Sequence, residues 1–363
     1  MPLTESQIQD ALKELIDPNT GKDFISAKSA KNIRIEGDNV SLDIVLGYPA
    51  KSVLQDVKSL VESKLRSVPG IGNIQVNIGS RIVPHSVQRG VPLLPGVKNI
   101  IAVASGKGGV GKSTTAVNLA LALAQEGASV GILDADIYGP SQPQMLGIND
   151  KPESKDGKSM EPLESHGIQA MSIGFLVDMD TPMVWRGPMV TGALEQLLRE
   201  TRWRDLDYLV IDLPPGTGDI QLTLAQKIPV TGAVIVTTPQ DIALLDARKG
   251  LKMFEKVGIP ILGIVENMST HICSSCGHEE HIFGAGGAEK MHQDYNVDLL
   301  GALPLDIRIR EQTDGGRPTV VAEPDSQIAA TYRQIARKVG YKLSMLSLDH
   351  SSKFPNIVIE KNS

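Results

Sequence analysis

The chain has 363 residues, of which 41% are hydrophobic and 21% charged, with a net charge of −6; this is an ordinary globular mixture with material for about two domains. The negative charge argues against bulk nucleic-acid binding, no apolar run approaches the ~20 residues that span a bilayer, and the polar N-terminus lacks the features of a signal peptide, so we expect neither nucleic acid nor membrane among the partners. Two cysteines in a chain of this length do not make a disulfide framework, which predicts a reducing, cytoplasmic location.

Residues 1–79 are expected to form a small α/β domain. Thr4 and Gln7 form a capping-box pattern that opens an amphipathic helix. Alternating apolar residues on both sides of a turn at Gly37 predict a β-hairpin. Apolar residues at helical spacing and then a short alternating run follow, which predict a second helix and a last strand. The predicted order is αββαβ.

The pattern changes after this first domain. Residues 80–97 predict a linker, because prolines and glycines interrupt any sustained period. Over residues 98–342 short apolar runs alternate with helical stretches, and several runs are apolar without a gap, which is typical of strands buried on both faces. The predicted fold class is therefore α/β, with a doubly wound, mostly parallel sheet. Residues 343–363 show little pattern and are expected to be a tail.

The strongest motif is SGKGGVGKSTT at residues 105–115, which fits the phosphate-binding pattern G-x-x-x-x-G-K-[ST]. It follows an apolar strand and opens a helix, the context that this motif requires. Lys112 is expected to be catalytic and to reach the β- and γ-phosphates of ATP, and the Ser113 hydroxyl is expected to reach Mg²⁺. Glycines allow backbone N–H groups to turn toward phosphate oxygens. The predicted nucleotide-binding residues of the loop are Gly106, Lys107, Gly108, Gly109, Val110, Gly111, Lys112, Ser113 and Thr114.

Carboxylates end two other apolar runs, where they are expected to meet the same site. Asp212 ends YLVID, the place of an acid that holds Mg²⁺ through water. Asp134 and Asp136 end GILDAD, and one of them is expected to orient or deprotonate the attacking water. We assign this catalytic role to Asp136 and keep Asp134 as the alternative. Each carboxylate could instead cap the turn that follows its strand.

An additional lysine, Lys107, follows the first glycine and resembles the deviant P-loop of the ParA/MinD-like ATPases. The segments DADIYGPS, IDLPPGTGD, WRGPM at 185–189 and ENMS at 266–269, together with a CxxC motif, resemble the Mrp/ApbC branch, the iron–sulfur cluster carrier proteins. The resemblance covers residue 95 to about residue 340. It implies a P-loop NTPase domain and a homodimer in which the early lysine acts on the partner's nucleotide.

The resemblance also extends to the adenine site and to the N-terminal domain. It implies that Asn267 contacts the adenine edge, although a turn residue after a strand is the alternative, and that residues 303–306 close over the base. The first domain resembles the cluster-assembly-associated domain often fused to this branch. Its segment GYPAKSV carries no cysteine where such domains can have one, so we expect it to dock partners rather than bind a cluster.

Cys273 and Cys276, the only cysteines, have the spacing of a metal chelate but supply half of the four ligands that zinc or a cluster needs. One alternative is a redox disulfide. Another is zinc within one chain, completed by His271, His278 or His281. A twofold dimer, as the early lysine implies, would instead bring two identical loops together and supply four thiolates for a bridging [4Fe–4S] cluster.

The sequence thus predicts a cytoplasmic, homodimeric ATPase that binds an iron–sulfur cluster and passes it to apo-proteins, with cluster assembly factors as further partners. ATP, Mg²⁺ and the cluster are the predicted ligands. The alternatives are a ParA/MinD-like positioning ATPase and a zinc-stabilised regulatory ATPase. The C-terminal segment is not a basic amphipathic helix and no basic stripe is present, which disfavours a membrane- or DNA-bound positioning protein.

Overall fold

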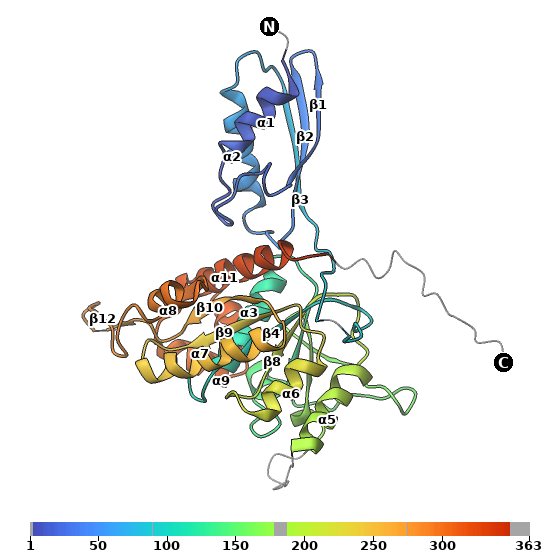
Figure 1. The fold of residues 1–363 in the computed structure, drawn as a ribbon, viewed down its shortest axis with the longest axis vertical. Helices are drawn as coiled ribbons and strands as arrows, with labels where there is room; N and C mark the ends of the chain where they lie inside the picture. Colours follow the sequence, from blue (N-terminus) through green and yellow to red (C-terminus); the bar gives the residue numbers. More distant parts are fainter. Residues whose placement is uncertain (1–2, 89, 178–186, 274, 349–363) are drawn as a thin grey trace, which may run out of the picture.

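The computed structural model describes residues 3–88, 90–177, 187–273 and 275–348. Trp185 and Arg186 of the WRGPM segment and most of the expected tail lie outside these residues. Figure 1 shows a small N-terminal domain standing on a larger α/β domain, with α11 (Gln327–Ser344) lying between them. Among the described residues, no helix combines the length and apolar character needed to cross a membrane.

The small domain has the predicted αββαβ order. Its elements are α1 (Glu5–Lys13), β1 (Ala30–Glu36), β2 (Asn39–Leu46), α2 (Leu54–Arg66) and β3 (Ile74–Ser80). The capping box forms as expected: the Thr4 hydroxyl accepts from the Gln7 backbone, and the Gln7 side chain accepts from the Thr4 backbone. β2 pairs antiparallel with β1 and parallel with β3. Apolar side chains of both helices and of β2 form the core.

The large domain is built on an eight-stranded sheet with the order β13-β10-β9-β4-β8-β5-β7-β6. Every neighbouring pair is parallel except β6 and β7, which form an antiparallel edge hairpin that the sequence pattern did not reveal. The predicted mostly parallel sheet is confirmed. The strands are β4 (Val97–Ala104), β5 (Val130–Asp134), β6 (Leu163–Ser165), β7 (Ile168–Ser172), β8 (Leu206–Asp212), β9 (Gly232–Thr237), β10 (Ile261–Glu266) and β13 (Leu299–Ala302).

Helices connect and cover these strands. α3 packs against β5 and β8 and against α11, whereas α7 packs against β9 and β10. Because the sheet is parallel, the carboxyl ends of its strands lie along one edge, and the loops that follow them form a common site. The helices of this domain are α3 (Lys112–Gln125), α4 (Gln142–Leu146), α5 (Gly187–Glu200), α6 (Asp219–Lys227), α7 (Asp241–Lys256), α8 (Gly287–Tyr295), α9 (Ile307–Asp314), α10 (Thr319–Ala322) and α11 (Gln327–Ser344).

Candidate functional site

The loop between β4 and α3 has the backbone shape of an anion cradle. Gly109 and Gly111 have φ angles of 79° and 78°, in the left-handed region that only glycine adopts without strain. Gly111 is the N-cap of α3, so the positive end of that helix faces the loop. Gly106 is needed for a different reason: a Cβ there would overlap the backbone carbonyl of Asp246 in α7. The loop is thus held against a second helix.

Lys112 and Asp212 meet at the centre of this site. Lys112 is 6% exposed and forms an ion pair with Asp212, which is fully buried at the end of β8. The Lys112 ammonium also lies 3.1 Å from the Ser113 hydroxyl. Gln142, which the sequence motifs did not identify, donates to Asp212 at 3.0 Å and to the Ser113 carbonyl at 3.2 Å. A phosphate that attracted Lys112 would free Asp212 to face Mg²⁺.

The two carboxylates of GILDAD lie in different environments. Asp134 is fully buried. Its carboxylate accepts four hydrogen bonds of 3.0–3.2 Å, from the backbone N–H groups of Asp136, Ser141 and Gln142 and from the Ser172 hydroxyl. Burial and the neighbouring Asp212 carboxylate raise the pKa of Asp134 to about 7. Asp136 is only partly buried, and burial raises its pKa as well. Partial exposure favours Asp136 as the group that positions water, and this assignment stays a prediction.

Lys107 and Asn267, whose roles came from the resemblance, contact their own chain here. Lys107 Nζ lies 3.5 Å from Oε1 of Gln240, the N-cap of α7. The Asn267 amide donates to the Val110 carbonyl at 2.9 Å and therefore supports the P-loop backbone. Residues 303–306 lie beside the segment that follows Asn267, and backbone hydrogen bonds join the two segments. Their roles toward a nucleotide remain predictions.

Cys273 and Cys276 lie on a short hairpin formed by β11 (His271–Ile272) and β12 (Glu279–Glu280). Figure 1 shows β12 at the left edge of the large domain, where it projects away from the sheet. Cys276 is exposed, Cys273 is partly exposed, and both thiols are free. Hydrogen bonds from the backbone N–H groups of Cys276 and Ser275 lower the pKa of Cys273. This favours the thiolate, which is the form that binds metals.

The histidines near the thiols attach the hairpin to the domain. His271 Nδ1 lies 3.1 Å from the Leu305 carbonyl oxygen, and His281 Nδ1 lies 3.0 Å from that of Ser269. His278 is exposed. Within the residues that the structure describes, no three side chains of His, Cys, Asp or Glu are grouped to hold a metal ion. The described part of one chain therefore brings two thiols together without a third ligand.

Comparisons with known proteins match both domains. A family described as "NUBPL iron-transfer P-loop NTPase" matches residues 96–340, and one described as "Iron-sulfur cluster assembly protein" matches residues 5–78. These matches confirm the family resemblance that the motifs predicted.

Individual relatives cover most of the chain. It is 62% identical over 279 residues to an iron-sulfur cluster carrier protein of Pseudomonas fragi, covering 76% of this chain and 97% of that protein. It is 53% identical over 339 residues to the iron-sulfur cluster carrier protein of Escherichia coli strain K12, and this match covers 93% of this chain and 92% of that protein. The solved structure of a nucleotide-binding protein from Archaeoglobus fulgidus, in complex with ADP, is 39% identical in sequence and matches with a TM-score of 0.56. The match covers 64% of this chain and 91% of that chain.

Proposed function

This chain belongs to the NUBPL iron-transfer P-loop NTPase family, and we propose that it is a homodimeric ATPase that carries an iron–sulfur cluster to apo-proteins. The observation that carries the proposal is a pair of free thiols, one exposed and one partly exposed, in the same domain as a complete P-loop. The Escherichia coli relative, whose match covers 93% of this chain and 92% of that protein, is named an iron-sulfur cluster carrier protein. The cluster is the cargo, and ATP is the substrate.

In the proposed nucleotide site, the phosphates of ATP take the place of Asp212 as the partner of Lys112. The freed Asp212 carboxylate and the Ser113 hydroxyl would hold Mg²⁺, and Asp136 would orient the attacking water. Lys112, Asp212 and Ser113 already lie within one hydrogen-bonded cluster. The P-loop N–H groups and Lys112 would stabilise the charge that grows on the transferring phosphoryl group.

In the proposed dimer, two P-loop faces meet and the cysteine hairpins approach each other. Ile242 and Leu245, in the first turns of α7, are 69% and 53% exposed, and Ile272 and Ile282, on the hairpin and directly after it, are 58% and 52% exposed. Burial of these apolar side chains would stabilise the proposed interface. α7 begins beside Lys107, so an interface there would bring that lysine close to the partner. Four thiolates would then hold one [4Fe–4S] cluster.

The N-terminal domain would dock apo-proteins or cluster assembly factors, as expected from its match to the iron-sulfur cluster assembly family. Cytoplasmic conditions would keep both thiols reduced for cluster binding. A positioning ATPase does not account for the thiol pair, and a zinc-stabilised regulatory ATPase does not account for the carrier names of the relatives.

Anaerobic reconstitution with iron and sulfide tests this function. We expect a visible absorption band, four irons per two chains, and a dimer by analytical ultracentrifugation, because each chain contributes two of about four ligands. The reconstituted protein should then activate an apo-protein that needs a [4Fe–4S] cluster. One tightly held zinc per chain, with no cluster, would support the regulatory ATPase instead.

Lys107→Ala is expected to reduce hydrolysis while largely sparing nucleotide affinity, since a lysine acting across the dimer stabilises charge that develops only in the transition state. Mixing Lys107→Ala with Lys112→Arg chains should recover activity, because one site of each heterodimer keeps both lysines. Gln240→Ala removes the contact of Lys107 within its own chain and should leave the rate close to wild type. Mixtures without recovery, together with a slow Gln240→Ala variant, would show that Lys107 acts within its own chain.

A further inference from the structure

The N-terminal domain rests on the end of the P-loop helix that lies opposite the phosphate site. α3 begins at Lys112 and has Glu126 as its C-cap. Its 14 residues make a rod roughly 21 Å long, and most of its side chains are buried. In Figure 1 the small domain stands directly above α11 and the end of α3.

Glu126 binds the small domain with both its backbone and its side chain, although it is only 1% exposed. Its carbonyl oxygen accepts from the Lys51 backbone at 3.0 Å. Its carboxylate accepts from the Ser52 backbone at 3.0 Å and from the Ser52 hydroxyl at 2.6 Å. Arg337 of α11 pairs with the same carboxylate at 2.6 Å and donates to the Asn19 side chain at 2.9 Å. Two helices of the large domain thus bind the small domain through one charge pair.

A buried ion pair of this kind fixes a position more than it adds stability, because desolvation offsets much of its attraction. The packing around it is equally specific. A Cβ on Gly47 would lie 2.8 Å from Ser344 Cβ, so the Gly47 backbone packs directly against the Ser344 side chain. Tyr48 packs edge to face on Tyr341, with ring centroids 6.2 Å apart.

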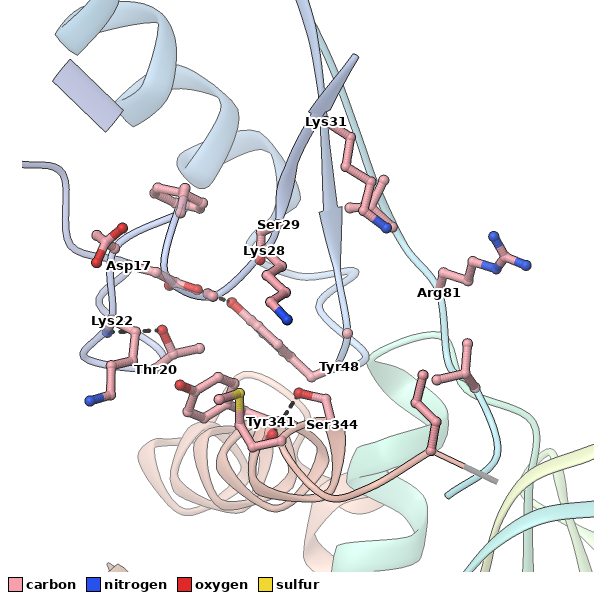
Figure 2. A pocket seen from close by; sticks show the side chains of 18 residues that line it. Asp17, Thr20, Lys22, Lys28, Ser29, Lys31, Tyr48, Arg81, Tyr341 and Ser344 are labelled. Atoms are coloured by element: carbon pink, nitrogen blue, oxygen red, sulfur yellow. Dashed lines mark hydrogen bonds between the residues drawn. The ribbon is translucent and has the colours of Figure 1, made fainter. Parts of the chain in front are cut away.

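Figure 2 shows the region between the small domain and α11 from close by. In Figure 2 the Tyr48 hydroxyl points toward Asp17, to which it donates at 2.6 Å, and the Tyr48 ring lies close to Tyr341 of α11. A cavity of about 230 Å³ lies between these groups. The small domain therefore contacts Glu126 of α3 and several side chains of α11, and the cavity lies beside these contacts.

We propose that Glu126 is a positioning residue that couples nucleotide binding to docking of the N-terminal domain; the proposal rests on the nucleotide site proposed above. Phosphate binding requires Lys112, in the first turn of α3, to exchange its contact with Asp212. The docked domain contacts the C-terminal end of α3 and so keeps the P-loop N–H groups, at the other end of this helix, in the position that binds phosphate. Releasing the domain removes the contacts at the C-terminal end of α3 and thereby weakens nucleotide binding, and by linkage nucleotide strengthens docking by the same factor.

Glu126→Ala tests this coupling through ADP affinity and domain position together. Calorimetry with ADP and Mg²⁺ should show binding at least about fivefold weaker than wild type, the low end of typical coupling energies. Domain position is read by energy transfer between dyes on cysteines placed at Lys13 and Arg310, which are 54% and 63% exposed, in a Cys273→Ser, Cys276→Ser background. ADP should narrow the distance distribution of the full chain, and Glu126→Ala should broaden it.

Gly47→Val is the matched control, because it disturbs the packing of Gly47 on Ser344 without changing α3. It should weaken ADP binding in the same direction as Glu126→Ala. If Gly47→Val releases the domain but ADP affinity stays at the wild-type value, the coupling is wrong and Glu126 acts only on α3. Ser52→Ala, which keeps the pair of Glu126 with Arg337, provides a milder test should Glu126→Ala fail to fold. A wild-type chain that does not bind ADP would instead overturn the proposed nucleotide site, and the coupling with it.

Discussion

Lys112→Ala is expected to lower ATP hydrolysis at least about a hundredfold, the cost of removing one main group that stabilises transition-state charge. Lys112 is the first residue of the P-loop helix, and it lies within reach of both Ser113 and Asp212. Its ammonium would follow the phosphoryl group through the reaction. Phosphate release by the purified protein, measured against wild type at saturating ATP, gives the result.

The buried ion pair requires a second variant. Removing Lys112 leaves the Asp212 carboxylate fully buried without its cation, which costs about 3–5 kcal/mol of folding stability. Lys112→Arg keeps the positive charge, so its free energy of unfolding should be close to that of wild type. It should still lose most activity, because a planar guanidinium cannot replace a compact ammonium. Ser113→Ala should also lose activity, through the Mg²⁺ contact. Turnover near wild type in a folded Lys112→Arg or Ser113→Ala protein would rule out this loop as the hydrolytic site.

Cys273→Ser and Cys276→Ser are each expected to abolish cluster binding, because each single change would remove two of the four thiolates of the proposed dimer. Both residues lie on an exposed hairpin outside the core, so folding and ADP affinity should not change. Absorption spectra and iron content after anaerobic reconstitution provide the measurement, and the unfolding temperature provides the control.

Histidine variants separate the bridged cluster from zinc within one chain. His278→Ala changes an exposed side chain and should leave the cluster intact. His271→Ala removes a contact of the hairpin with Leu305, so it should loosen the hairpin and lower cluster stability without abolishing assembly. A cluster that survives loss of either cysteine would mean that its ligands lie elsewhere. A zinc ion that is lost with His278 would support zinc bound within one chain.

The local parts of the fold followed from the sequence. The P-loop could be predicted because its chemistry is confined to a few consecutive residues, with glycine at positions 109 and 111 where φ is positive. The αββαβ order of the small domain follows from hydrophobic periodicity, which is also a local property. The parallel core strands follow from continuous apolar runs that alternate with helical stretches. The pairing of β6 with β7 did not follow, because β6 has only three residues and too short a pattern to recognise.

Contacts between distant segments were decided only by the tertiary structure. Nothing in the sequence around Gln142 indicates that its amide reaches Asp212, 70 positions away. Glu126 likewise reads as an ordinary charge at a helix end, and only the docking of Ser52, 74 positions earlier in the chain, reveals what it binds. Sequence patterns report which residues are buried and which backbone shapes are allowed. The partner of a buried polar group depends on how separate elements pack, because a group removed from water must find its hydrogen bonds wherever the fold supplies them.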